Sequence, residues 1–328
     1  ITFSPSLANR DIVKSMAETG VTKMVGVPLV FEKMYNSIQS NISKLPPARK
    51  ALVKLLFLTA RMRRLFDKSL NGTKGIFKPL LEKAGFQNID FFVAGGAALP
   101  PHINKFFFLL GIPIIQGYGL TETSPVLSAV DPRDVDFYSV GRPLDGVTVR
   151  IYNPDETGVG EIVARGDNIM KGYYKEPGKT AEVLKQGWFY TGDYGFIDKK
   201  GRINIKGRLK NVIVSSGGKN IYPEEIEEIL IQCPYIEEVL VVGRDHPEAM
   251  IFPNMEKIEE WAAEHNITEI DDEKIRELLK HETDKLNSHL AQYKRVRKIT
   301  LRHEEFPKTS TRKIKRYLFM GDSAGADE

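Results

Sequence analysis

The sequence predicts an α/β fold: a parallel-sheet portion, then a β subdomain, then a small α+β domain at the carboxyl end. Helix and strand patterns alternate before Gly141, which is typical of parallel sheets. From Gly141, short alternating strands separated by Gly, Asn and Asp turns indicate a compact β subdomain. Because 328 residues exceed what one core usually holds, we expect two domains, residues 1–209 and 210–328, with the β subdomain at about 141–209.

Composition excludes several classes of function. The net charge of +4 comes from 47 basic and 43 acidic residues, a balance that gives no argument for a nucleic-acid partner. A single cysteine, Cys233, excludes an intrachain disulfide and a Cys-rich metal site, and it favours a cytoplasmic location. The longest apolar run, residues 106–115, is too short to span a bilayer. The histidines are scattered, so zinc and serine-hydrolase chemistry have no support.

Residues 12–42 predict a helix, a short strand and a second helix, and residues 46–70 predict a long amphipathic helix. Its basic residues share one face and most of its large apolar residues share the other: Lys50, Lys54, Arg61, Arg64 and Lys68 against Leu52, Leu55, Leu56, Leu65 and Phe66. We favour an ordinary surface helix whose apolar side faces its own core. The alternative is a helix that lies on an anionic membrane, which would give peripheral contact at the inner membrane face.

A β-α-β unit follows. A strand at 89–94 leads through a glycine turn into a helix that starts at Pro100 or Pro101 and ends at Gly111, and a second strand follows at 112–116. The two strands should be parallel neighbours, so the loops that leave them meet at one edge of the sheet. Ligands of open α/β sheets bind at that edge.

The two loops carry residue types that suit a nucleotide. After the first strand, Gly95 and Gly96 let the backbone approach a flat ligand closely, although such turns are common. In the second loop, "QGYGLTE", Tyr118 offers an aromatic face, Thr121 a hydroxyl and Glu122 a hard oxygen ligand for Mg²⁺. The alternative is a plain turn with a surface glutamate. Because both loops should lie at one edge of the sheet, we favour the nucleotide site over the plain turn.

The β subdomain contributes a further carboxylate. The segment "WFYTGDYG" places Asp193 on a glycine turn, where one carboxylate can accept hydrogen bonds from both hydroxyls of a ribose. An Asp that stabilises its own turn is the alternative. Arg208 ends the next hairpin, and hairpin geometry can bring its guanidinium beside Asp193, as a salt bridge or as a second ribose contact.

Two segments of the last domain are ambiguous by themselves. The loop "SSGGKN", residues 215–220, is not a Walker phosphate loop, because Asn follows Lys219 and Ile213 stands where the first glycine should be. It reads as a flexible loop with a cation, followed by a helix with an acidic first turn. The run "PKTSTRKIKR", residues 307–316, holds five basic residues and by composition is a solvated basic tail.

Five segments in order resemble one family. They are "QGYGLTETSP", "GEIVARG", "GWFYTGDYGFID", "GRLKNVIVSSGGKNIYPEEIE" and "PKTSTRKIKR". Their order and spacing resemble the adenylate-forming, or AMP-binding, superfamily. The segment "GWFYTGD" and the opening "ITFSPSL…MVGVPLVFEKMY" look most like those of long-chain fatty acid–CoA ligases. The resemblance implies an enzyme that joins a fatty acid to AMP at the expense of ATP, with Mg²⁺, and then transfers the acyl group to coenzyme A.

The resemblance also implies roles for individual positions. Gly95, Gly96 and Ala97 match the turn that borders adenine and the acyl pocket, and Gln116, Gly117, Tyr118 and Gly119 match the adenine-binding segment, in which Tyr118 stacks on the base. Thr121 matches a phosphate-contacting Thr and Glu122 a Mg²⁺ ligand. Asp193 matches the ribose-binding Asp, and Ile205 and Arg208 match two further nucleotide contacts. The remaining matches are a loop facing the pantetheine tunnel, namely Gly217, Gly218 and Lys219, and a domain hinge at Lys210.

Lys313 matches the family's lysine that reaches the α-phosphate and the attacking carboxylate. The family usually has Gly before this lysine, whereas Arg312 precedes it here, so the inward-pointing residue is one of this pair. We expect Lys308, Lys315 and Arg316 to be solvated charges, with Arg316 alternatively contacting the ligand or its own domain. Thr121, Glu122 and Lys313 are therefore the expected catalytic residues.

Two further interpretations of the function stay open. An acyl-AMP ligase or adenylation domain would pass the acyl group to a carrier-protein thiol instead of coenzyme A. A non-catalytic membrane-associated module would use the helix at 46–70. Apolar residues such as Phe31 are more often core than acyl tunnel, so we expect Phe31 to lie in the core.

The family carries a Ser/Thr/Gly-rich phosphate loop before the other segments, and this sequence contains none. The chain is therefore expected to be a carboxyl-terminal portion that shows negligible ligase activity by itself. An ATP–pyrophosphate exchange assay with several fatty acids measures this, and robust exchange by the isolated chain would refute the expectation.

Overall fold

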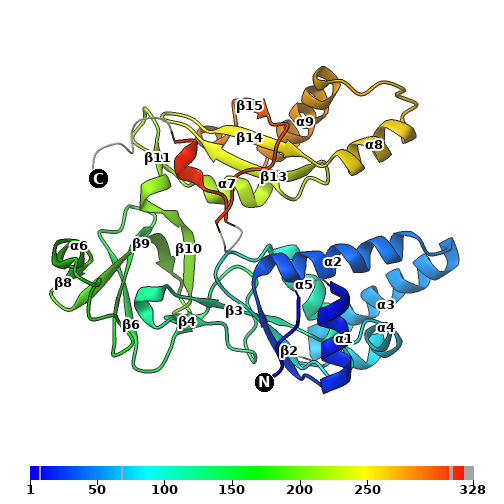
Figure 1. The fold of residues 1–328 in the computed structure, drawn as a ribbon, viewed down its shortest axis with the longest axis horizontal. Coiled ribbons are helices and arrows are strands. Elements are labelled where there is room, and N and C mark those ends of the chain that lie inside the picture. The colour runs from blue at the N-terminus through cyan, green and yellow to red at the C-terminus, as the bar shows by residue number, and fades with distance from the viewer. Residues whose placement is uncertain (7–8, 68, 310–312, 321–328) are drawn as a thin grey trace. The chain divides into compact units, whose positions relative to one another are not determined.

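The structure is a computed structural model that describes residues 1–6, 9–67, 69–309 and 313–320. The chain divides into two compact units (Figure 1): the first unit is residues 1–191 and 195–205, and the second is residues 192–194 and those from 206 onward. The predicted α/β fold class, with a β subdomain and a small α+β domain, is confirmed.

The first unit begins with an α/β portion built on a five-stranded sheet of order β1-β2-β3-β4-β5. Its first three strands are parallel and β4 and β5 are antiparallel additions. The strands are β1 (Lys23–Gly26), β2 (Phe91–Ala94), β3 (Ile114–Tyr118), β4 (Ser128–Ala129) and β5 (Arg142–Pro143). The helices are α1 (Asn9–Thr19), α2 (Pro28–Ser43), α3 (Pro47–Phe66), α4 (Lys78–Lys83) and α5 (Pro101–Leu110).

The predicted β-α-β unit is confirmed as β2, α5 and β3, because β2 and β3 are parallel neighbours. Helix α5 begins at Pro101 and its C-cap is Gly111, as the proline and glycine at its two ends predict. Gly111 has φ 83° and a Cβ there would lie 2.4 Å from the amide nitrogen of Lys74. Only glycine fits, because a side chain would need both a left-handed backbone and space that is already filled.

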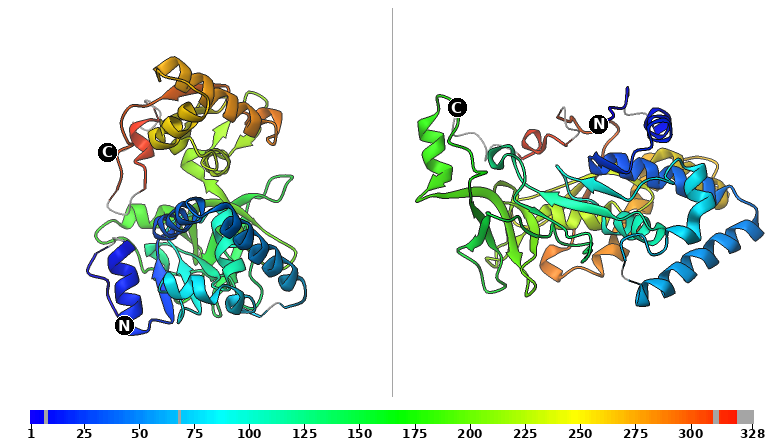
Figure 2. Two further views of the ribbon diagram at one scale, coloured as in Figure 1. Left: turned by 90° about the vertical axis from the view of Figure 1, so that its right-hand side faces the viewer. Right: turned by 90° about the horizontal axis from the view of Figure 1, so that it is seen from below.

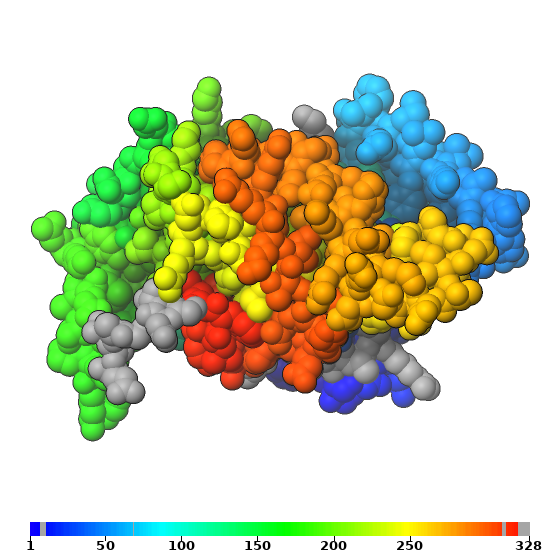
Figure 3. Space-filling view, turned by 90° about the horizontal axis from the view of Figure 1, so that it is seen from above, coloured from blue at the N-terminus to red at the C-terminus, as the bar shows by residue number. Residues whose placement is uncertain are grey.

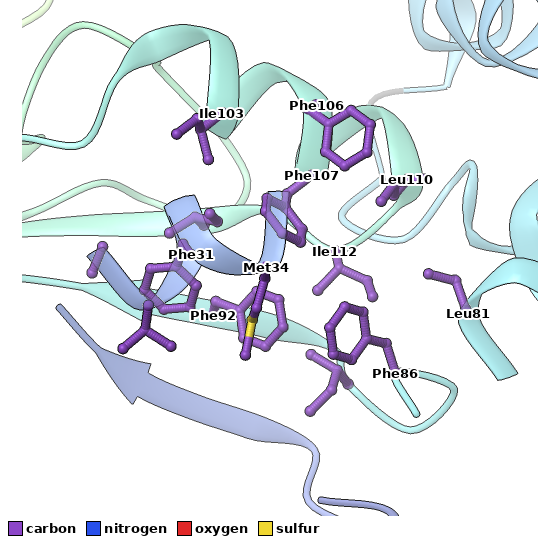
Figure 4. Packing of buried hydrophobic residues seen from close by; sticks show 14 of the residues in the cluster. Phe31, Met34, Leu81, Phe86, Phe92, Ile103, Phe106, Phe107, Leu110 and Ile112 are labelled. Atoms are coloured by element: carbon purple, nitrogen blue, oxygen red, sulfur yellow. The ribbon is translucent and has the colours of Figure 1, made fainter. Parts of the chain in front are cut away.

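Aromatic side chains fill the core between this sheet and its helices (Figure 4). Phe31 of α2 and Phe107 of α5 lie against Phe92 of β2, with ring centroids 5.2 Å and 5.6 Å away. All three are fully buried. The expectation that Phe31 belongs to the core is confirmed, and Phe106, Phe107 and Leu110 of the apolar run at 106–115 are buried as well.

The β subdomain is a sheet of order β10-β9-β7-β6, with β8 paired to β9. Its elements are β6 (Thr148–Tyr152), β7 (Gly160–Arg165), α6 (Pro177–Val183), β8 (Leu184–Lys185), β9 (Trp188–Ile197) and β10 (Ile203–Arg208). The short strands expected after Gly141 are confirmed as β6, β7, β9 and β10, whereas α6 and β8 were not predicted. Among the described residues, no helix is long and apolar enough to cross a membrane.

The second unit packs helices on a three-stranded sheet of order β13-β14-β15, in which β14 is antiparallel to β13 and parallel to β15. Its elements are β11 (Ile213–Val214), β12 (Asn220–Ile221), α7 (Pro223–Leu230), β13 (Ile236–Val242), β14 (Glu248–Pro253), α8 (Met255–Glu264), α9 (Asp272–Asn287) and β15 (Lys298–Leu301). Ile226, Ile251 and Leu279 are fully buried at its centre.

Candidate functional site

The two glycine-containing loops leave the sheet side by side. Ala94 pairs with Gln116 across β2 and β3, so both strands end at the same edge. A Cβ on Gly95 would lie 3.9 Å from the carbonyl oxygen of Gly117, which shows how closely the loops approach. Gly96 and Ala97 are exposed beyond that contact. The structure therefore confirms that residues 95–97 and 117–122 share the carboxyl edge of the sheet.

The segment expected to bind adenine is largely packed into the protein. Gln116 and Tyr118 are 7% and 8% exposed, and Tyr118 belongs to a core cluster with residues of the β subdomain. A Cβ on Gly119 would lie 1.8 Å from the carbonyl oxygen of Pro125, because the chain folds back on itself there. Stacking of Tyr118 on a base stays a prediction.

The turn that carries Thr121 and Glu122 is held by three partly buried hydrogen bonds. The hydroxyl of Thr123, which is fully buried, accepts a hydrogen bond from the Leu120 amide at 2.9 Å. The side-chain amide of Asn168 donates to the carbonyl oxygens of Thr123 and Val126, at 3.0 and 2.9 Å. A segment of the β subdomain therefore fixes the loop from 45 residues away.

Glu122 has a partner that the sequence patterns did not reveal. The Tyr173 hydroxyl donates to Oε1 of Glu122 at 2.9 Å, and the Met170 amide donates to the Glu122 carbonyl oxygen at 2.8 Å. Burial is the main cause of the raised pKa of Tyr173, and the hydrogen bond to Glu122 raises this pKa further. Tyr173 therefore remains a donor and orients the carboxylate.

A single oriented carboxylate suits Mg²⁺ better than it suits a metal ion whose ligands all come from the protein. Within the described ranges, no group of three or more His, Cys, Asp or Glu side chains could hold a metal ion. Mg²⁺ commonly takes one or two carboxylates and completes its shell with water and substrate phosphates. Glu122 is a suitable ligand of that kind.

Asp193 and Arg208 form the predicted ion pair. Nε of Arg208 lies 2.9 Å from Oδ1 of Asp193, whose side chain is 7% exposed, whereas the arginine side chain is 57% exposed. The salt-bridge prediction is confirmed, and a ribose contact by either residue stays a prediction. Ile205, on β10 with Arg208, packs against the core cluster of the β subdomain.

Lys313 lies on a short hairpin in the second unit. The Thr309 amide donates to the Lys313 carbonyl oxygen, and the Lys315 amide donates to that of Pro307, both at 2.8 Å. The predicted partner Arg312 is outside the described residues. Burial lowers the pKa of the Lys313 amine, the positive charge of Arg208 lowers it further, and Asp193 raises it. The structure therefore brings Lys313 into the electrostatic range of two other predicted site residues of the same unit.

Ion pairs anchor both strands of this hairpin, contrary to the expectation of solvated charges. Lys308, 20% exposed at its side chain, pairs with Glu238 and also with Glu305 at 2.9 Å. Arg316, 14% exposed, donates to both oxygens of Glu227 at 2.7 Å and to the Val241 carbonyl oxygen at 2.6 Å. The solvated expectation is therefore wrong for Lys308 and Arg316, and Arg316 contacts its own domain.

Residues 1–174 match the family model of AMP-binding enzymes, and residues 210–322 match the model of the AMP-binding enzyme C-terminal domain. The chain belongs to the AMP-binding enzyme family. The predicted membership of the adenylate-forming superfamily is thereby confirmed.

Curated relatives of this AMP-binding enzyme include ligases for long-chain fatty acids. A probable acyl-activating enzyme 16 of Arabidopsis thaliana chloroplasts is 35% identical over 78% of this chain and 43% of the relative. The long-chain-fatty-acid–CoA ligase heimdall of Drosophila melanogaster is 36% identical over 72% of the chain and 36% of the relative. The chain thus spans less than half the length of the curated relatives it matches.

Solved structures with the same fold include o-succinylbenzoate CoA synthetase of Bacillus subtilis with an acyl-adenylate intermediate. It is 21% identical with a TM-score of 0.68, and the match covers 95% of this chain and 53% of that one. ATP-bound MatB of Rhodopseudomonas palustris is 23% identical with a TM-score of 0.66, over 97% and 53% of the two chains. At these identities the likeness shows the fold.

The remaining predicted positions of this AMP-binding enzyme lie at the start of the second unit. Residues 215–219 form the turn between β11 and β12, where the Ser215 amide donates to the Lys219 carbonyl oxygen at 3.0 Å. Gly218 has φ 70°, and Nζ of Lys219 lies 5.4 Å from the ring centroid of Tyr293. The hinge at Lys210 and the tunnel role of 217–219 stay predictions.

Arg316→Met should destabilise the second unit by about 3 kcal/mol, because it leaves the largely buried carboxylate of Glu227 without its counter-charge. Adding Glu227→Gln should recover part of that loss, since the unpaired charge is removed. Urea unfolding monitored by circular dichroism measures both. Lys315→Met is the matched control and should change stability by no more than about 0.5 kcal/mol. Equal effects of the two single substitutions would contradict an anchoring role for Arg316.

Proposed function

We propose that this chain supplies the carboxyl-terminal half of an AMP-forming long-chain fatty acid–CoA ligase. Such an enzyme joins a fatty acid to AMP from ATP, releases pyrophosphate, and transfers the acyl group to coenzyme A. Family membership supports the adenylate-forming chemistry, and the chain length of the acid rests on the names of relatives. These include the Drosophila ligase at 36% identity and an Escherichia coli long-chain-fatty-acid–CoA ligase at 35%.

The electrostatic interaction of Lys313 with Asp193 and Arg208 is the observation that supports the proposed chemistry. Adenylation brings a carboxylate anion onto a phosphate anion, so the two reactants repel each other. A preorganised ammonium at the point of attack offsets the charge that develops there. The hairpin anchors hold the lysine backbone in place, and its partly desolvated amine interacts with the charges of the Asp193–Arg208 pair that is proposed to bind ribose.

Glu122 supplies the proposed metal ligand, oriented by Tyr173. Mg²⁺ bound there would neutralise part of the phosphate charge of ATP. Thr121, on the same turn, would contact a phosphate through its hydroxyl, and the backbone of 95–97 and 116–119 would border the base and the acyl group. Alignment of both reactants by these contacts supplies the proximity part of catalysis.

Lys210 is proposed as the hinge that lets one nucleotide site serve both half-reactions. Rotation about it would exchange Lys313 for the loop 217–219, which would then face the pantetheine thiol. Coenzyme A is therefore proposed as the second substrate.

A carrier-protein acceptor is the second candidate. A chloroplast long-chain-fatty-acid–acyl-carrier-protein ligase of Arabidopsis thaliana is 34% identical over 71% of this chain and 40% of the relative. The rates of acyl transfer to coenzyme A and to holo-acyl carrier protein, measured from the same pre-made acyl-adenylate, separate the two acceptors.

Lys313→Ala in the enzyme that carries this chain should slow acyl-adenylate formation by about 100-fold or more, because a charge-stabilising cation is lost from the transition state. Thioester formation from pre-made acyl-adenylate should stay nearly unchanged, since that step does not use the lysine. ATP–pyrophosphate exchange and thiol acylation measure the two steps. Lys315→Ala on the same hairpin is the control and should preserve both. Equal loss of both half-reactions in Lys313→Ala would overturn the assignment.

A further inference from the structure

Helix α3 is fixed to the first unit along one narrow stripe. Phe57 stacks on Phe106 of α5 at 5.3 Å between ring centroids, and Ala60 is fully buried one turn further on. Another turn along, the Arg64 guanidinium donates to the Phe108 carbonyl oxygen at 2.7 Å and lies 3.9 Å from the Phe108 ring centroid. Because these residues are spaced by three and four positions, they set the rotation of the helix about its axis.

The opposite side of the helix is apolar and exposed. The expectation that the apolar side faces its own core is therefore wrong for Leu52, Leu55, Leu65 and Phe66, whereas Leu56 packs against the core as expected. We call this surface the α3 outer face; its side chains are 54–89% exposed, and they are Leu52, Leu55, Leu58, Met62, Leu65 and Phe66. Helix α3 lies at the margin of the first unit in Figure 1 and in the right-hand view of Figure 2. Its atoms are the light-blue group at the upper right of Figure 3.

Cations border the α3 outer face on both sides. Lys54 and Arg61 each precede a leucine of the face by one helical turn, Leu58 and Leu65 respectively, and both cations are exposed. On the other border, Arg63 lies one turn before the end of the helix and pairs with Asp67 at 3.4 Å. The helix itself, residues 47–66, contains no Asp or Glu.

We propose that the α3 outer face docks on the surface of an anionic lipid bilayer. An apolar stripe flanked by Lys and Arg suits the boundary between acyl chains and headgroups, where the apolar side chains are buried and the cations meet lipid phosphates. Residues 47–66 contain no acidic residue, and Asp67, the next residue along, is paired with Arg63, so little repulsion opposes an anionic surface. This inference does not depend on the proposed ligase activity.

Co-sedimentation with phosphatidylcholine vesicles that contain about 30% phosphatidylglycerol tests the proposal. The chain should bind at about 50 mM NaCl and lose most binding at about 500 mM, because salt screens the cations. Lys54→Glu/Arg61→Glu should weaken binding by at least about ten-fold, since each cation near an anionic surface contributes about five-fold. Leu55→Ser/Met62→Ser should weaken it by a similar factor through lost apolar burial.

Lys280→Glu, an exposed charge reversal on α9, is the matched control and should preserve binding. Unchanged thermal midpoints should show that all the variants fold, because every substituted side chain is exposed. The proposal is overturned if the chain does not bind anionic vesicles at low salt, or if neither double variant weakens binding. It is also overturned if sedimentation equilibrium shows lipid-free dimers that the same substitutions dissociate, since the face would then belong to a second copy.

Discussion

The ion pair between Arg316 and Glu227 is the interaction on which the placement of Lys313 depends. It ties the end of the carboxyl-terminal hairpin to α7, while Lys308 ties its beginning to Glu238. Burial raises the pKa of Glu227, and the charge of Arg316 opposes that shift and keeps the carboxylate paired. Lys308 and Arg316 of this basic run are therefore structural cations, and Lys313 between them is the residue that is proposed to take part in catalysis.

A comparable constraint acts on the first unit. Parallel pairing of β2 and β3 brings two loops to one sheet edge, but pairing alone does not orient Glu122. Its orientation comes from Asn168 and Tyr173, which belong to an irregular segment of the β subdomain. In both units, the side chain with proposed chemistry is held by neighbours distant in sequence, so those neighbours are positioning residues.

The elements that the sequence predicted well are those with local signals. Helix α5 has Pro at its start and Gly111 at its end, and the strands of the β subdomain alternate between glycine turns. The candidate site residues were identified from five sequence segments that occur in the same order as in the family. The sequence indicated which of these residues lie close together only where two strands were expected to pair. Lys308 and Arg316 were misjudged because Glu238 and Glu227, the carboxylates that hold them on the domain, are distant in sequence; Arg316 and Glu227 are separated by 89 residues. Periodicity showed that α3 has two faces, but only packing shows which one the chain covers.

The pKa of the Lys313 amine, measured by NMR of the chain with labelled lysine side chains, tests most directly whether this cation lies beside the proposed ribose site. The Lys313 resonance should titrate below the other exposed lysines. Its pKa should fall further in Asp193→Asn, which removes the attractive charge, and rise in Arg208→Gln, which removes the repulsive one. A Lys313 resonance that titrates with the bulk lysines and responds to neither substitution would contradict the placement.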